Sequence, residues 1–530
     1  MNRHFLILFS FLLLSVPMFA ESGLPVVEIK ADRTMIYPQR MELTGEESLM
    51  DILQMVPELL IGGYEDVLSS YDLRIDNGPI NGDTRLILSQ MKAKDIAKIQ
   101  VCDNTGVAKG TIGMGRVLDI NMKMPERLKG FVEGQGDFGK NAAGNVTVNA
   151  IYGSKGTDLY TNASYRHQEW NEEYLTLHMT NRFGDRNKLL TYFTQQYLDI
   201  PSGTSRKVMG RARYFHTFND VGTELLIMGG YQYSSNMILS NKLPLYVVEL
   251  NTPLFSKRLS MMLGVEGDFL MTGEKGVNRS WDVFNNDIYL QFTYSLPKWK
   301  FTVGNRVMFY NYKVMEAGNS QKYSTTRDNA NACIIYLPDN RNQIQLGYYR
   351  KYYNPSYLSL FMDDSNNIFN SERAMTWGLL KEHNIHQVKL AYAYSRQKLT
   401  VQTETGYYMV GDSENFTELS VSAYWKTKGL SLTGGANIYI AKSGTYTSLR
   451  FAPTAYLPHD WQIGMQVVYY TKKTPAREST GVPVYGCLSV NKQFGRKWSL
   501  GVDWHDMFDT FCCNTNVNRH AANIKVQYRF

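Results

Sequence analysis

Apolar and polar residues alternate with period two in most runs after Pro125. Successive side chains of a β-strand point to opposite faces, so this period predicts strands with two unlike faces. The last run is the clearest: one face holds Ala522, Ile524, Val526, Tyr528 and Phe530, and the other holds Asn523, Lys525, Gln527 and Arg529. A single strand of this kind fits the edge of a soluble sandwich as well as the wall of a membrane barrel.

Four further runs decide between these alternatives. They begin at Trp299, near Phe416, at Leu430 and at Trp461, and the first two carry charges such as Arg306 on their polar faces. A sandwich core does not accept unpaired charges, whereas a wide aqueous lumen does. The pattern therefore predicts an all-β transmembrane barrel with lipid outside and a polar lumen inside.

Short breaks rich in Pro, Gly, Asn and Asp separate the strands, as expected for tight turns. They lie at 154–156, 184–186, 219–222, 256–257, 297–298, 338–340, 397–398, 428–429, 458–460 and 495–497. With a second connection between each pair of tight turns, the count is about 22 antiparallel strands, an even number as in single-chain barrels. The longest break is Asn354–Asn384, and the chain ends on the tight-turn side, which we expect to be periplasmic.

The N-terminal region has a different organisation. Residues 1–20 contain the one long apolar run, Phe5–Ala20, after Arg3, and they predict a signal peptide cleaved after Ala20. Glu21 follows, so a lipid-modified cysteine is not expected.

Residues 24–125 read as a small mixed α/β domain, followed by the barrel over 126–530. Thr44 and Glu47 form a capping-box pair ahead of a helix over Glu46–Leu60. Short strands are predicted at Leu73–Asp76, Thr84–Leu88, Asp95–Val101 and Arg116–Lys123.

Composition agrees with a barrel and argues against several other kinds of protein. Aromatic residues make up 13% of the 530 residues, with 36 Tyr, as interfacial girdles of a barrel would require. The net charge of +7 is spread along the chain, so we expect no nucleic-acid partner. The five cysteines have irregular spacing and predict neither a disulfide framework nor a metal site.

Catalytic chemistry is absent from the sequence patterns. The stretch Gly134–Gly139 matches a dinucleotide fingerprint, but no strand–turn–helix unit surrounds it, so it reads as the first barrel strand. HExxH, GxSxG and P-loop motifs do not occur. We therefore expect a protein that is not an enzyme, with no catalytic residues, no metal site and no cofactor.

Five short motifs, in order along residues 24–125, resemble the plug of TonB-dependent receptors, most closely the outer-membrane β-barrel family proteins of Bacteroidetes. The motifs are Ala31-Asp32-Arg33, Ser48–Leu53 with Val56-Pro57, Leu73–Pro79 with Arg74, Asp76 and Gly78, Asp95–Val101, and Gly113–Lys123 with Gly113 and Gly115. The chain departs from the family pattern at Asn77, where Gly is usual, and at Gly115-Arg116, where a Gly pair is usual.

The resemblance implies a receptor in the outer membrane of a Gram-negative bacterium that takes up a scarce solute with energy from TonB. It leaves the solute open between iron chelate, cobalamin, oligosaccharide and peptide. Outer-membrane lipid, TonB and the barrel-assembly machinery are the implied partners.

The resemblance also suggests roles for the two ends of the mature chain. Val26, Val27, Glu28 and Ile29 form the candidate TonB-contacting segment, which would pair by strand addition, or else the first strand of the plug. Tyr528 and Phe530 form the candidate signal for barrel assembly. The short loops and altered motifs also fit a structural or adhesion-type barrel, or a passive partner of a surface complex, that is not coupled to TonB.

Five charged residues are expected to face the lumen and set its electrostatic field. They are Arg306, Lys389, Glu404, Lys426 and Lys525.

Overall fold

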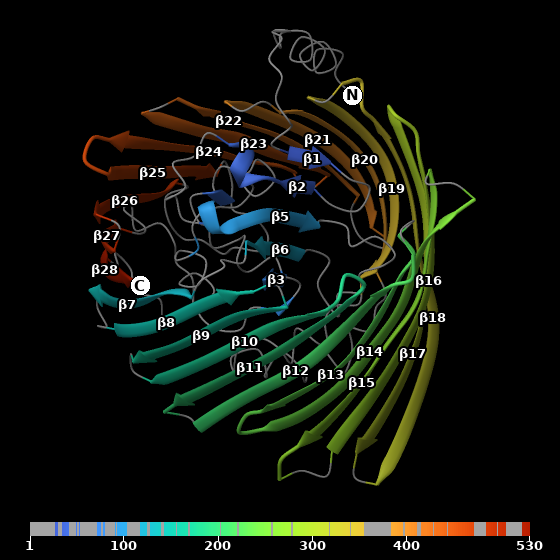
Figure 1. The fold of residues 1–530 in the computed structure, drawn as a ribbon. Helices are drawn as coiled ribbons and strands as arrows, with labels where there is room; N and C mark the ends of the chain where they lie inside the picture. The colour runs from blue at the N-terminus through green and yellow to red at the C-terminus, as the bar shows by residue number, and fades with distance from the viewer. Residues whose placement is uncertain are drawn as a thin grey trace.

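A computed structural model shows a closed barrel with a smaller sheet inside its lumen (Figure 1). The structure describes residues 27–29, 34–41, 49, 52–53, 72–75, 78–79, 91, 93–102, 117–123, 128–138, 143–154, 156–167, 170–201, 203–219, 222–255, 258–276, 279–316, 318–339, 341–353, 383–395, 398–410, 415–427, 429–442, 444–470, 484–495, 497–504 and 522–530. The predicted signal peptide lies outside these residues.

The barrel consists of the 22 strands β7 to β28, so the predicted number is confirmed. Each strand pairs antiparallel with the next, and β28 pairs with β7 to close the ring. The strands are β7 Lys129–Phe138, β8 Ala143–Gly153, β9 Thr157–His167, β10 Asn171–Phe183, β11 Asn187–Ile200, β12 Gly203–Thr217, β13 Glu224–Ser235, β14 Leu239–Leu254, β15 Leu259–Glu274, β16 Arg279–Ser295, β17 Trp299–Glu316, β18 Asn319–Tyr336, β19 Asn342–Tyr353, β20 His383–Ser395, β21 Leu399–Val410, β22 Phe416–Lys426, β23 Leu430–Ala441, β24 Gly444–Leu457, β25 Trp461–Tyr470, β26 Val484–Phe494, β27 Trp498–Trp504 and β28 Ala522–Arg529.

The barrel wall is polar inside and apolar outside. On β8, Thr147 and Asn149 are 1% and 4% exposed, whereas Val146 and Val148 are 52% and 44% exposed. A soluble protein buries its apolar residues, so this inverted pattern fits a wall between lipid and a filled, polar lumen.

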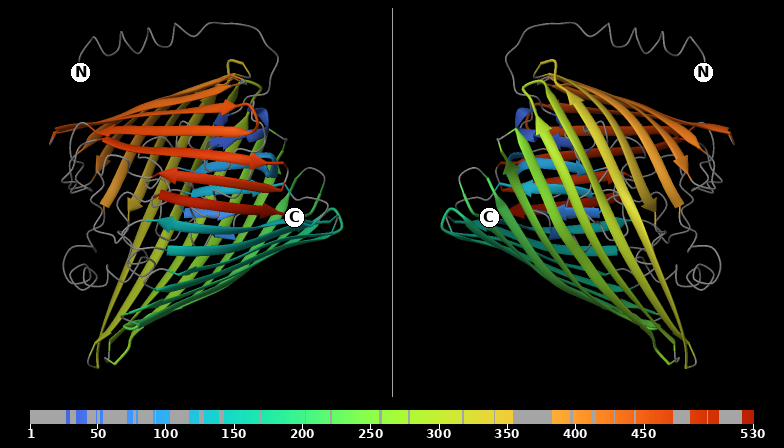
Figure 2. Two further views of the ribbon diagram at one scale, coloured as in Figure 1. Left: turned by 90° about the vertical axis from the view of Figure 1, so that its left-hand side faces the viewer. Right: turned by 90° about the vertical axis from the view of Figure 1, so that its right-hand side faces the viewer.

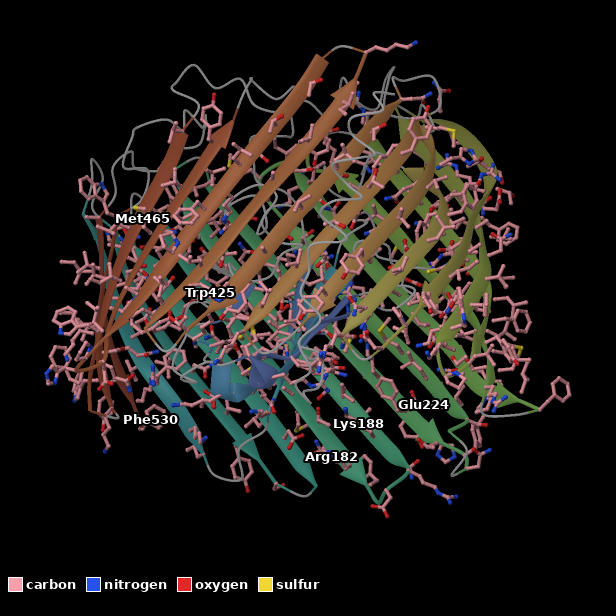
Figure 3. All side chains as sticks on the ribbon, turned by 90° about the horizontal axis from the view of Figure 1, so that it is seen from above. Arg182, Lys188, Glu224, Trp425, Met465 and Phe530 are labelled. Atoms are coloured by element: carbon pink, nitrogen blue, oxygen red, sulfur yellow. The ribbon has the colours of Figure 1, made fainter. Side chains whose placement is uncertain are left out.

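All ten predicted tight turns fall between consecutive strands, and they share one rim of the barrel. Figure 3 labels Arg182, Lys188, Glu224 and Phe530 along this tight-turn rim. Exposed aromatic residues stand at the strand ends of the same rim: Phe183, Tyr294, Trp299, Trp425, Trp461, Phe494, Trp498 and Phe530. They form one of the two aromatic girdles that flank the apolar band of a membrane barrel.

The wall is uneven in height. Strands β17 and β18 have 18 residues each, whereas β27 has seven. Figure 2 shows the long strands extending well beyond the short ones. Because about 9–11 residues suffice to cross a bilayer, the long strands continue past the membrane.

The plug sheet is the N-terminal sheet, with strand order β1-β2-β5-β6-β3-β4. Its elements are β1 Val27–Ile29, β2 Thr34–Ile36, the 3-10 helices η1 Pro38–Arg40 and η3 Ala93–Asp95, β3 Asp72–Ile75, β4 Gly78–Pro79, β5 Ile96–Cys102 and β6 Val117–Met122. Strands β3, β5 and β6 match predicted strands. The predicted strand Thr84–Leu88 lies outside the described residues, as does most of the predicted helix Glu46–Leu60.

The plug has its own apolar core. Leu49 and Ile52 are helical and fully buried, and they pack with Ile99, Leu118 and Ile120 of the sheet. The mixed α/β character predicted for this part is therefore observed. Among the described residues, no helix is long and apolar enough to cross a membrane.

Candidate functional site

The plug sheet crosses the lumen of the barrel, as Figure 1 shows. Strand β1, at one edge of the sheet, lies against β19 and β20 of the wall. The apolar core of the plug continues onto the wall through Tyr160 of β9 and Tyr424 of β22, which are 2% and 1% exposed. At the tight-turn rim, Lys129 lies 4.0 Å from Asp95. The plug is thus packed into the barrel on several sides.

The face of the plug sheet that points away from the apolar core is polar. Asp119 of β6 is fully buried, and its Oδ2 accepts hydrogen bonds from the amides of Gln100 at 3.3 Å and Asn121 at 3.4 Å. Gln100 also donates to the Oδ1 of Asn121 at 2.6 Å. Arg74 of β3 is the direct neighbour of Asp119 in the parallel pair of β3 with β6. This network fixes a charged surface inside the lumen.

Arg213 on β12 connects this polar face to the wall. It interacts electrostatically with Asp119 and Arg74 of the plug and with Glu266 of β15. Its Nε also contacts the sulfur of Met228 at 3.0 Å. A shift of the plug would therefore change the field at the wall.

The charged wall cluster centres on Arg306 of β17. The Nε of Arg306 donates to Oδ2 of Asp287 at 2.8 Å, and its terminal nitrogen donates to Oε2 of Glu266 at 3.0 Å. Its guanidinium also lies 5.4 Å from the ring centre of Tyr289. Arg306 is 4% exposed, so these contacts replace its hydration.

Tyr289 extends the cluster along the wall. Its ring lies across the backbone of Gly264, where an added Cβ would come within 2.2 Å of the ring. Its hydroxyl donates to Oε2 of Glu249 at 2.8 Å. Because Gly264 of β15 has no side chain, Tyr289 of β16 can reach across it to Glu249 of β14.

A further buried acid lies beside this cluster. Asp268 accepts a hydrogen bond from the amide of Asn285 at 2.9 Å. With Glu249, Glu266 and Asp287, the wall of β14–β17 carries four carboxylates around Arg306. The described lumen is thus suited to recognising a solute by hydrogen bonds and charge. Among the described residues, no three or more His, Cys, Asp or Glu side chains are arranged to hold a metal ion.

The five charged residues expected in the lumen do face inward, and each has a partner. Lys389 and Glu404 pair at 2.6 Å, Lys525 pairs with Asp503 at 2.6 Å, and the ammonium of Lys426 lies 4.6 Å from the ring centre of Tyr456. Together with Arg306, they act first as cross-strand contacts that hold the wall.

The candidate TonB-contacting segment is part of the plug sheet. Val27, Glu28 and Ile29 form β1 and pair with Ile36, Met35 and Thr34 of β2. Val26 lies outside the described residues. The segment is therefore the first strand of the plug in this structure, and contact with TonB would require release from β2 or use of its other edge.

The plug motif is only partly described. Arg74 lies in β3 and Gly78 in β4, and these strands pair with Ile75 opposite Gly78. Asp76, Gly113 and Gly115 lie outside the described residues.

The C-terminal pair lies at the barrel seam. Tyr528 pairs with Val132 of β7, which confirms that the last strand closes the barrel against the first. The Phe530 N–H donates to the Gly130 carbonyl at 3.0 Å. The Phe530 ring occupies the space beside Gly130, where a Cβ would come within 2.5 Å of it.

Glu266, Asp287 and Tyr289 were not among the residues predicted to face the lumen. The period-two alternation of apolar and polar residues in β15 and β16 indicates that these side chains face inward. Their proximity to Arg306 depends on the register of three strands, which no single run reveals.

No protein-family model matches the chain, and no curated protein sequence matches it. Solved structures do share its fold. The siderophore receptor PirA from Pseudomonas aeruginosa aligns with a TM-score of 0.66 and 11% identity, over 95% of this chain and 100% of that one. The unliganded ferric citrate transporter FecA aligns with a TM-score of 0.69 and 12% identity, over 95% and 98%. The alcaligin outer-membrane receptor FauA from Bordetella pertussis aligns with a TM-score of 0.63 and 12% identity, over 95% of each chain. The chain therefore has the 22-strand barrel fold of these receptors.

Proposed function

We propose that this protein is a receptor in the outer membrane of a Gram-negative bacterium, and that it takes up a scarce solute with energy from TonB. The observation that carries the proposal is the plug sheet packed across the lumen of a closed barrel. An open pore passes solutes by diffusion, whereas a plugged one needs work to open. The siderophore and ferric citrate receptors that share the fold support the same function.

The proposed domains are a signal peptide over 1–20, a plug over 24–125 and a barrel over 126–530. The tight-turn rim faces the periplasm, since single-chain bacterial barrels have their short turns there. The barrel-assembly machinery inserts the protein, with Tyr528 and Phe530 as its signal.

Coupling would operate through a population shift of the plug. A solute that contacts the polar face of the plug and the charged wall cluster would favour a state in which β1 leaves β2. TonB would then pair with Val26–Ile29 by strand addition and pull on the plug.

A pull-down with the periplasmic domain of TonB tests this coupling. The mature protein should bind, and a form that lacks residues 21–30 should not. Strand addition uses backbone N–H groups, so Val27→Pro with Ile29→Pro should abolish binding, whereas Val27→Ala with Ile29→Ala should retain most of it. Equal binding by all four proteins would refute coupling through this segment. Absence of binding by the mature protein would favour a structural or adhesion-type barrel.

A further inference from the structure

A groove of about 530 Å³ lies in the outer wall of the barrel across β15–β20. The strand register places one row of outward residues across it: Phe292, Val303, Ala332, Tyr348 and Val388 on β16 to β20. Ala332 has the shortest side chain in this row, so the surface dips between the larger side chains of Val303 and Tyr348.

A second row lies one step nearer the tight-turn rim. Tyr294 pairs with Phe301, Phe301 with Ile334, and Ile334 with Leu346. These side chains are 38–49% exposed, so the groove opens outward. Strands are about 4.8 Å apart, so a row over five strands is about 19 Å long. This length suits one acyl chain, because half of the hydrocarbon core is about 15 Å thick.

Cations stand at the foot of the groove. Four successive tight turns on this side carry Arg258, Lys298, Arg341 and Lys398. Among the described residues of these turns, Asp339 is the one acid. They lie level with the girdle aromatics, which is the depth of lipid headgroups.

We propose that this groove binds an anionic phospholipid of the leaflet on the tight-turn side, with one acyl chain over Ala332 and the phosphate near Arg258 and Lys298. The apolar lining excludes a polar ligand, and the basic turns favour an anionic headgroup. Lipid of the opposite leaflet has its headgroup at the far rim, so it cannot place its phosphate at these turns.

Native mass spectrometry of the full-length protein, released from detergent after incubation with phosphatidylglycerol or phosphatidylcholine, tests the proposal. The wild-type protein should retain phosphatidylglycerol in preference to phosphatidylcholine. Ala332→Phe fills the dip and should remove the retained lipid. Ala423→Phe is the matched control, because Ala423 lies on the lipid-facing side of β22 at a similar distance from its tight turn, and it should change nothing.

The double variant Arg258→Gln with Lys298→Gln leaves the groove intact. It should lose the preference for phosphatidylglycerol, by about fivefold for each cation removed. Equal retention of the two lipids by the wild-type protein would overturn the anionic headgroup. Undiminished lipid retention by a folded Ala332→Phe variant would overturn the groove as the binding site.

Discussion

Replacing Arg306 by Met tests whether the charged wall cluster holds the barrel wall together. Methionine keeps much of the side-chain volume and removes the charge. In the native wall, Arg306 is held by Asp287 at 2.8 Å and by Glu266 at 3.0 Å. Glu266 and Asp287 are direct cross-strand neighbours, so the variant would leave two carboxylates opposite each other without a cation between them.

The expected loss follows from the burial of the cluster. The Arg306 side chain is 5% exposed, and those of Glu266 and Asp287 are 13% and 12% exposed. Removing one partner of a buried ion pair costs about 3–5 kcal/mol. Because the two acids keep some contact with the lumen, we expect a loss of about 3 kcal/mol, at the low end of that range.

Equilibrium unfolding by guanidinium in lipid vesicles, followed by tryptophan fluorescence, measures this loss. Lys442→Met is the control, because Lys442 lies exposed in the turn after β23, and it should leave the midpoint unchanged. Adding Glu266→Gln and Asp287→Asn to Arg306→Met should recover most of the stability, since the two side chains that Arg306 had held are then uncharged. A midpoint for Arg306→Met equal to that of wild type, or a triple variant no more stable than the single one, would refute the reasoning.

Three further outcomes follow from particular contacts. Gly264→Val should displace the Tyr289 ring and lower the stability by about 1–3 kcal/mol in the same unfolding assay, and it should cost much less in a Tyr289→Ala background, where the ring is absent. Deleting Phe530 should reduce the heat-modifiable folded band in outer-membrane fractions, and normal insertion would count against its role at the seam. Partial burial disfavours the charged form of Asp339, but hydrogen bonds from the N–H groups of Arg341 and Asn342 outweigh it and hold the Asp339 pKa below its ordinary value. The stability that Asp339 adds is present above the unfolded-state pKa and is lost as the pH falls through the lowered pKa, so Asp339→Ala should differ from wild type at neutral pH and not in strong acid.

The barrel was predictable because its wall separates two unlike surroundings. Lipid requires apolar side chains at every second position and the lumen favours polar ones, so the sequence of each strand indicates which of its faces points to the lumen. Val146 and Thr147 show this contrast directly, with 52% and 1% exposure.

Strand β14 shows where this signal weakens. Its inward residues Leu243, Leu245 and Val247 are apolar, and Leu245 and Val247 pack with Met228 in a small lumen cluster. Apolar side chains on both faces remove the alternation on which the prediction depends.

Partners within the lumen could not be predicted from single runs. Lys389 and Glu404 meet because β20 and β21 pair Ala391 with Glu404, and a slip of one residue would turn one of the two side chains outward. The segment Val27–Ile29 posed a different problem. A short extended segment suits a plug strand and a strand-addition partner equally well, and its pairing with β2 depends on the tertiary fold.

Planar-bilayer conductance tests the central claim, a plug that closes the barrel, most directly. The mature protein and a form lacking residues 24–125 would be inserted under the same conditions, with the heat-modifiable band confirming that both are folded. The mature protein should be electrically silent, and the form without the plug should give large, stable conductance steps. Similar conductance from both proteins would contradict the claim.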